Sequence, residues 1–155
     1  METIHRRSFI VMAGTALAFP GGRAHATVPT KMTVYRDPNC GCCHEWAKAM
    51  GSAGYSVDVH DTDDLAAVKA RLAVPPGMEG CHTAVVEEYY LEGHVPLEAV
   101  ERLLERPHIR GLAVPGMPPG SLGMGDDGKA VYDVYAIPSG AGAPYVFMEV
   151  RPRKG

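Results

Sequence analysis

The sequence predicts an α/β fold, because stretches typical of strands alternate along the chain with stretches typical of helices. Its 155 residues are enough for one domain with a substantial core, and no internal repeat divides them. Three cysteines within four residues follow the first predicted strand, where sheets of this class commonly place their binding sites. We therefore expect one α/β domain with a cysteine-based site at the edge of its sheet.

The first predicted strand, residues 31–36, alternates apolar and polar side chains and ends at a turn with the sequence Asp-Pro-Asn. A helix is predicted over 41–50, with Trp46 on its inner face, and a second alternating strand over 55–60. Asp61 or Thr62 is the expected cap of the next helix, which ends before the two prolines at 75 and 76.

The second half of the chain begins with a predicted hairpin, residues 83–87 and 89–95, and a third helix over 97–105. Residues 111–155 are predicted to extend this domain. They comprise a loop rich in glycine, proline and methionine, residues 111–124, and a short closing pair of strands, residues 132–136 and 145–150. The predicted order before this extension is β-α-β-α-β-β-α.

This order, with cysteines where the first strand meets the first helix, resembles the thioredoxin-like fold in its glutaredoxin-sized form. The first two strands are then parallel, since a helix connects them. That fold carries a proline before its third strand, where this sequence has Cys81 and His82 instead. The strand ends would bring Cys81, His82, His94 and His60 to the edge that carries the cysteine cluster.

The cluster consists of Cys40, Cys42 and Cys43. Residues three apart share a helix face, so Cys40 and Cys43 lie together while Cys42 points away from Cys43. A dithiol enzyme needs only two thiols, whereas extra thiolates suit Cu(I), zinc or an iron–sulfur cluster. We favour Cu(I), because it accepts two or three sulfurs and thiolates bridge several ions. Zinc is the alternative metal.

Other candidate ligands lie outside the cysteine cluster. Met117 and Met124 offer thioethers, which are soft ligands for Cu(I), although packing in the core or in a lid also explains methionines in such a loop. His82 and His94 are candidates either to bind metal or to hydrogen-bond to its ligands. His44, His60 and His108 are not expected to bind, and Trp46 is expected in the core.

Residues 1–26 are predicted to be a cleaved export signal. Arg6 and Arg7 precede an apolar run, residues 9–19, that is shorter than the ~20 residues needed to span a bilayer, and Ala-His-Ala at 24–26 suits cleavage. The paired arginines resemble a twin-arginine signal, with an ordinary Sec signal as the alternative. We expect a mature domain, residues 27–155, in the periplasm.

The net charge of the whole chain is −3, and no basic cluster is present. Loss of residues 1–26, which contain three arginines and one glutamate, would take it to about −5. This charge argues against nucleic acid and against an anionic membrane as partners of the mature domain.

The combination of motifs resembles the CopG-type family of copper-resistance proteins. The resemblance rests on four segments: residues 35–43 with Trp46, 81–84, 92–96 and 111–117. It implies a thioredoxin-like scaffold, a periplasmic location and a copper-linked function, with Cys40, Cys42, Cys43 and Cys81 as the ligands. Leu122 departs from the pattern, which has proline in the methionine loop.

The leading hypothesis is therefore a non-catalytic protein of copper resistance that sequesters Cu(I) or hands it on to other periplasmic copper-handling proteins, with a redox-linked site for several ions as part of this hypothesis. Three alternatives remain open. The chain is a thiol–disulfide oxidoreductase using Cys40 and Cys43, a zinc-stabilised interaction module, or an exported domain with two structural disulfides.

Overall fold

The computed structural model describes residues 29–125 and 128–152, so the predicted export signal lies outside the described residues. These residues form one mixed sheet of seven strands with three α-helices. The strands are β1 (Lys31–Arg36), β2 (Ser56–Asp61), β3 (His82–Val86), β4 (Tyr89–Glu92), β5 (Ile109–Ala113), β6 (Tyr132–Pro138) and β7 (Tyr145–Val150). The helices are α1 (Gly41–Ser52), α2 (Leu65–Leu72) and α3 (Leu97–Leu103).

The strands lie in the order β2-β1-β3-β4-β5-β6-β7. β1 and β2 are parallel, as predicted from the helix that joins them, and β1-β3 and β3-β4 are antiparallel. β4 and β5 are parallel, and the last three strands pair antiparallel. The element order predicted up to α3 is confirmed, but the sheet is larger than that order implies.

Residues 109–113 are the main difference from the predicted elements. The sequence predicts that residues 111–113 belong to the methionine loop, whereas they form part of β5, between β4 and β6. The predicted closing strands, β6 and β7, consequently continue the same sheet instead of forming a separate pair. The loop proper begins after Ala113.

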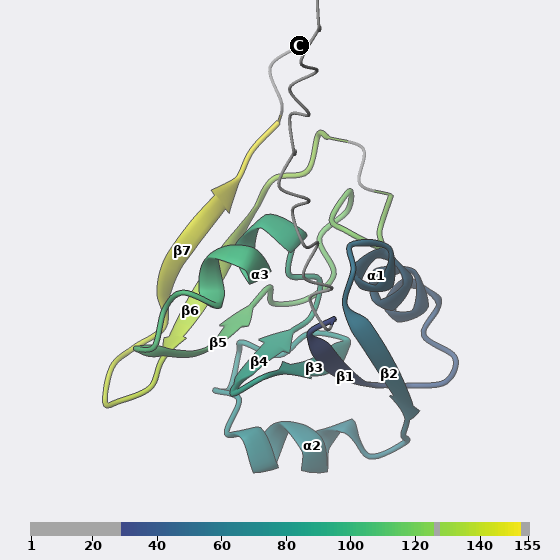
Figure 1. The fold of residues 1–155 in the computed structure, drawn as a ribbon. Helices are drawn as coiled ribbons and strands as arrows, with labels where there is room; N and C mark the ends of the chain where they lie inside the picture. Colours follow the sequence, from purple (N-terminus) through teal and green to yellow (C-terminus); the bar gives the residue numbers. More distant parts are fainter. Residues whose placement is uncertain (1–28, 126–127, 153–155) are drawn as a thin grey trace, which may run out of the picture.

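The helices cover both faces of the sheet. α1 and α3 lie on one face and α2 on the other (Figure 1). The larger core lies under α1 and α3 and includes Trp46, Met32 and Leu91, so Trp46 is a core residue as predicted. A smaller apolar cluster lies on the α2 face around Tyr90 and Ile137. Side chains alternate along β3 and β4, so each strand contributes to both layers.

The predicted N-cap of α2 is wrong. Asp64, and neither Asp61 nor Thr62, caps the helix, because its Oδ1 accepts a hydrogen bond of 3.0 Å from the Ala67 N–H. Thr62 lies before the cap, and its hydroxyl accepts a hydrogen bond from the Asp64 N–H. The helix ends at Ala73, whose φ of 51° reverses the chain before the two prolines.

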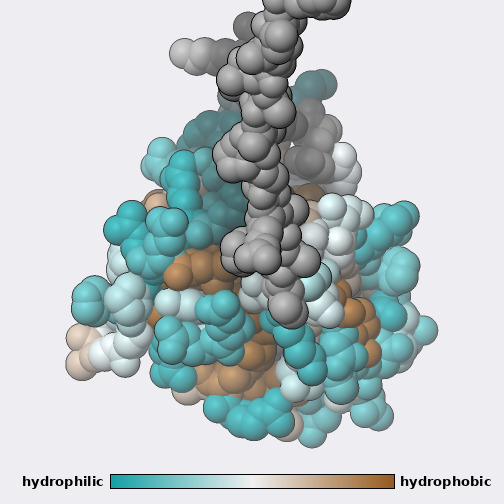
Figure 2. All heavy atoms as spheres, viewed as in Figure 1, coloured by the Kyte–Doolittle hydropathy of each residue, from teal (hydrophilic) through white to brown (hydrophobic). Residues whose placement is uncertain are grey.

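Hydrophilic residues cover much of the surface seen in Figure 2, with smaller apolar patches between them. The three helices have 12, 8 and 7 residues. Among the described residues, none of them has the length and apolar character needed to cross a membrane.

Candidate metal centre

The cysteine cluster lies at the amino end of α1, directly after β1. A turn closed by a 3.0 Å hydrogen bond from the Cys40 N–H to the Asp37 carbonyl places Cys40 at the N-cap of the helix. Cys43 then faces the core and is buried, whereas Cys42 is half-buried at the rim of the helix. Cys42 therefore lies on a different side of the helix from Cys43, as predicted, although its sulfur stays close to that of Cys40.

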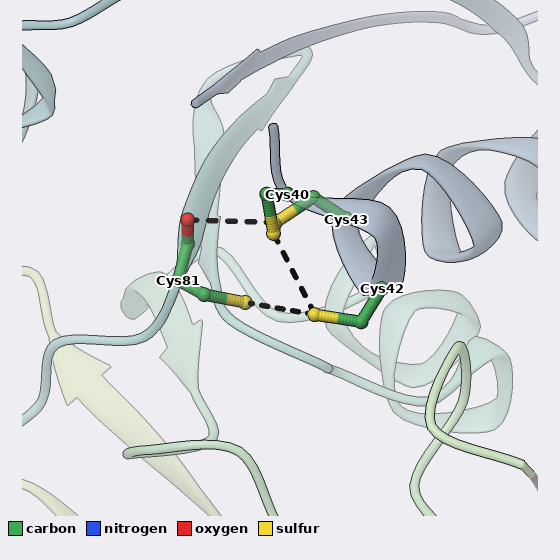
Figure 3. Close-up of side chains that lie close together, drawn as sticks. All are labelled: Cys40, Cys42, Cys43 and Cys81. Carbon is green, nitrogen blue, oxygen red and sulfur yellow. Dashed lines mark hydrogen bonds between the residues drawn. A yellow bond between two sulfur atoms is a disulfide. The ribbon is translucent and has the colours of Figure 1, made fainter. Parts of the chain in front are cut away.

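Cys40 and Cys43 form a disulfide, while Cys42 and Cys81 are free thiols (Figure 3). The two bonded cysteines are the pair that the sequence predicts to share one face of the helix. Of the two disulfides that one alternative required, the described residues contain this one only.

The fourth cysteine lies across the site from α1 (Figure 3). Cys81 precedes β3, and its Sγ lies 4.0 Å from the Cys42 Sγ, which in turn lies 3.5 Å from the Cys40 Sγ. The Cys43 Sγ lies 3.6 Å from the Cys81 carbonyl oxygen. Figure 3 shows the Cys42 and Cys81 side chains pointing toward one another across the gap between α1 and this segment. All four sulfurs lie within 4.8 Å of one another.

His94 faces the same thiol from the end of β4. Its Nδ1 lies 2.7 Å from the Leu122 carbonyl oxygen, which only accepts, so Nδ1 carries the proton. The other nitrogen, Nε2, is left with a lone pair 3.0 Å from the Cys81 Sγ. A neutral imidazole held in this way by a backbone carbonyl is the usual arrangement of a metal-binding histidine.

His82 completes a second group of ligand atoms. Its Nδ1 lies 3.4 Å from the Cys81 Sγ, and its ring packs against Trp46 with centroids 4.5 Å apart. Its Nε2 is buried and finds no hydrogen-bond partner among the described residues. The ligand atoms of Cys81, His82 and His94 lie within 4.8 Å of one another, so Cys81 belongs both to this group and to the sulfur group.

Burial controls the protonation of these groups in the metal-free protein. Loss of hydration lowers the pKa of His82 to about 3, with help from nearby His94 and Lys69, and also lowers the pKa of His94. Burial, together with repulsion from Cys42, raises the pKa of Cys81 to about 12. Near neutral pH both imidazoles are therefore neutral, and Cys81 is a thiol that donates to His94. A cation that binds there displaces the thiol proton.

Comparisons with known proteins give consistent results. The model of a family described as "Protein of unknown function, DUF411" matches residues 78–124, the segment that contains Cys81, both of these histidines and the methionine loop. A solved structure described as "Copper resistance protein copG- Form 1" is 41% identical, with a TM-score of 0.75, over 80% of this chain and 99% of its own. Its Form 2 is also 41% identical, with a TM-score of 0.74, over 79% and 98%. No curated protein sequence matches.

The chain belongs to the CopG family. The family resemblance drawn from the cysteine and histidine motifs is therefore confirmed.

The methionine loop of this CopG-family chain packs against the start of α1. A Cβ on Gly123 would lie 2.8 Å from the Cys42 carbonyl oxygen, so the loop backbone touches the helix directly. Met124 follows this contact and is half-buried, whereas Met117 is 55% exposed. Met117 follows Gly116, which pairs with Gly80 one residue before Cys81. Both methionines thus lie on backbone that borders the site, and their role as ligands stays a prediction.

The other histidines among the described residues lie outside the site. His60 lies near the end of the exposed edge strand β2 and pairs with Asp58, with 3.1 Å between its Nε2 and the carboxylate. His44 and His108 are exposed. One group that the sequence did not point to contacts the site directly: the Leu122 carbonyl, which accepts from His94. A backbone carbonyl leaves no signal in the sequence, so this contact could not be predicted from it.

Proposed function

We propose that this protein binds Cu(I) through Cys40, Cys42, Cys43 and Cys81 and serves copper resistance or homeostasis. The observation that supports this best is the convergence of four cysteine sulfurs within 4.8 Å, from two segments of the chain, in a relative of proteins described as copper resistance proteins. Thiolates bind Cu(I) in preference to harder cations. Four non-equivalent sulfurs at this spacing also suit thiolate bridging, and hence a site for several ions.

The donor set fits this assignment. Nε2 of His94 and Nδ1 of His82 both face Cys81 with neutral imidazoles, and the His82 ring has a buried nitrogen without a partner among the described residues. Cys81 would be the ligand shared between sulfur and nitrogen donors. A mixed set of this kind supports copper in two oxidation states, since imidazole also suits Cu(II). Met117 and Met124 would add soft donors from the bordering loop.

The scaffold and the location form part of the same proposal. Residues 31–103 provide the strand order β2-β1-β3-β4 with α1 and α3 on one face and α2 on the other, which supports a thioredoxin-like unit extended by β5, β6 and β7. The predicted export signal, residues 1–26, supports a periplasmic location for the mature protein, and other copper-handling proteins there would be its partners.

A metal-competition experiment tests the assignment. The reduced mature chain would be prepared anaerobically and titrated with Cu(I) against a Cu(I) chelator, and separately with Zn(II). We expect copper to remain on the protein under conditions that strip zinc, because thiolate-rich sites favour the softer ion. Stoichiometric zinc that Cu(I) fails to displace would favour the zinc-stabilised interaction module instead.

One observation favours the second candidate, a thiol–disulfide oxidoreductase: Cys40 and Cys43 are disulfide-bonded at the start of a helix. Cys42→Ser separates the two functions. An exchange enzyme needs an attacking thiol and a resolving thiol, so it retains activity without Cys42. A bridged copper site loses copper from Cys42→Ser about as severely as from Cys40→Ser, which is the result we expect. Insulin-reducing activity that survives Cys42→Ser and is lost in Cys40→Ser would establish the enzyme.

A further inference from the structure

A buried pair of opposite charges lies on the α2 face of the sheet, behind the metal centre. Lys69 comes from α2 and Glu92 from β4, and their side chains form an ion pair in which the carboxylate is fully buried and the lysine 11% exposed. Buried charges are costly unless they are paired and hydrogen-bonded, and such pairs are often replaceable by apolar side chains with no loss of stability. Stability alone is therefore a weak explanation for this pair.

The hydrogen bonds of the pair converge on one residue, Gly80. The Gly80 N–H donates to Oε1 of Glu92 at 2.8 Å, and the Gly80 carbonyl accepts from Nζ of Lys69 at 3.1 Å. The two peptide groups that flank Gly80 are thus both held by charged partners. Thr83 closes the network, since its hydroxyl donates to Oε2 of Glu92 at 2.7 Å and accepts from Lys69 at 3.2 Å.

Backbone packing further restricts the position of Gly80. A Cβ on Gly80 would lie 2.4 Å from the Cα of Gly93, so the two backbones are in direct contact. The Gly93 N–H also donates to the His82 carbonyl at 2.9 Å. Cys81 lies between these two fixed points, and His94 directly follows Gly93. The position of the Cys81 thiol relative to its neighbours therefore depends on how Gly80 is held.

We propose that Lys69 and Glu92 are positioning residues for Cys81, which fix both peptide groups of Gly80 and thereby hold the Cys81 thiol against Cys42 and His94. The ion pair touches none of the four sulfurs and acts through the backbone. Charge-assisted hydrogen bonds are stronger and more directional than apolar contacts, and this explains why charges occupy a place that apolar side chains would otherwise fill. The consequence for copper rests on the proposed function, whereas the positioning itself does not.

A metal-free measurement tests the positioning directly. In a Cys40→Ser/Cys43→Ser background the remaining thiols are Cys42 and Cys81, whose sulfurs lie 4.0 Å apart. Equilibration with reduced and oxidised glutathione gives the effective concentration of one thiol at the other. We expect Lys69→Met/Glu92→Leu to lower this value at least roughly tenfold, because Cys81 is then free to move away.

Matched variants distinguish positioning from general destabilisation. Leu103→Ala removes a fully buried side chain of α3 that takes no part in the network, so it lowers stability while leaving the effective concentration unchanged. Glu92→Leu removes the acceptor of the Gly80 N–H and provides the readout if the double variant does not fold, whereas Glu92→Gln keeps a neutral oxygen there and is expected to lose less. An unchanged value in both the double variant and Glu92→Leu would overturn the proposal, as would an equal loss in Leu103→Ala.

Copper binding provides the second readout, in the otherwise wild-type chain. Lys69→Met/Glu92→Leu is expected to lower copper stoichiometry and to change the thiolate-to-copper charge-transfer spectrum, whereas Leu103→Ala keeps both. Failure of the wild type to bind copper would defeat the proposed function, and the glutathione measurement would still decide the positioning. Normal copper binding in a double variant with a loosened thiol pair would overturn the link between positioning and copper.

Discussion

Cys81 is the residue at which the two groups of ligand atoms overlap. The sequence places it outside the cysteine cluster, and only the pairing of β1 with β3, in which Arg36 lies opposite His82, brings it there. Its predicted approach to Cys42 was correct because that pairing follows from the order of the elements. The protonation states of Cys81, His82 and His94 could not be predicted from the sequence, because they depend on how deeply each side chain is buried. His82 is fully buried although it lies next to a half-buried cysteine.

The buried His82 leads to a prediction about pH. In the unfolded chain its imidazole takes up a proton below the ordinary pKa of 6.5, whereas the folded protein resists protonation down to about 3. The unfolded state therefore binds more protons between these values, and the free energy of unfolding falls as the pH falls through this window, by up to about 1.4 kcal/mol per pH unit. Urea unfolding of metal-free protein at several pH values measures this slope. His82→Phe is expected to flatten it, and His44→Phe, at an exposed position, is not. Equal slopes in the wild type and His82→Phe would contradict this account.

At the scale of elements, strands with regular alternation were predictable and β5 was not. Its sequence contains Gly111 and is followed by Pro115, which together are typical of a loop. The structure gives a physical reason for the glycine, because a Cβ at this position would lie 2.6 Å from the ring of Tyr90 on the neighbouring strand. A glycine that makes room for a neighbouring aromatic ring depends on a partner distant in sequence, so local pattern assigns it wrongly. The predicted hairpin, β3 and β4, depends on neighbours close in sequence and was confirmed.

The contact between the methionine loop and α1 leads to a prediction at this scale. Gly123 has a φ of +85°, and a Cβ there would overlap the backbone of Cys42 and Trp46. Gly123→Ala is therefore expected to destabilise the protein by roughly 1–3 kcal/mol and to weaken copper binding, because the loop that supplies the Leu122 carbonyl to His94 has to move. Gly77→Ala is the matched control, since its φ is +81° with no atom within 4 Å of the added Cβ. Thermal unfolding and copper titration of both variants measure the difference. An equal copper affinity in the two variants would show that the loop does not support the site.

For the whole molecule, the disulfide separates two chemical states of the same fold. With Cys40 and Cys43 bonded, two of the four proposed cysteine ligands are not thiolates, whereas Cys42, Cys81 and the two histidines retain free donor atoms. The sequence could not have assigned this pairing uniquely, because three cysteines crowded within four residues allow several bonds. Two-electron reduction by an external dithiol restores both thiols, with one proton taken up at each sulfur near neutral pH. Under the proposed function, the oxidation state of Cys40 and Cys43 would determine how much copper the protein binds.

This dependence leads to the last prediction. Reduced and disulfide-bonded protein, both freed of reductant under anaerobic conditions, are titrated with Cu(I) in the presence of a Cu(I) chelator. We expect the reduced protein to bind more copper per chain, and copper to raise its unfolding temperature, because a ligand that binds only the folded state stabilises that state. The oxidised protein should bind less copper and gain less stability from it. Cys40→Ser/Cys43→Ser is the control that lacks the disulfide and both thiols, so it should resemble the oxidised protein under either condition. Equal copper stoichiometry in the oxidised and reduced wild type would show that Cys40 and Cys43 are not ligands, and would leave copper to Cys42, Cys81 and the histidines.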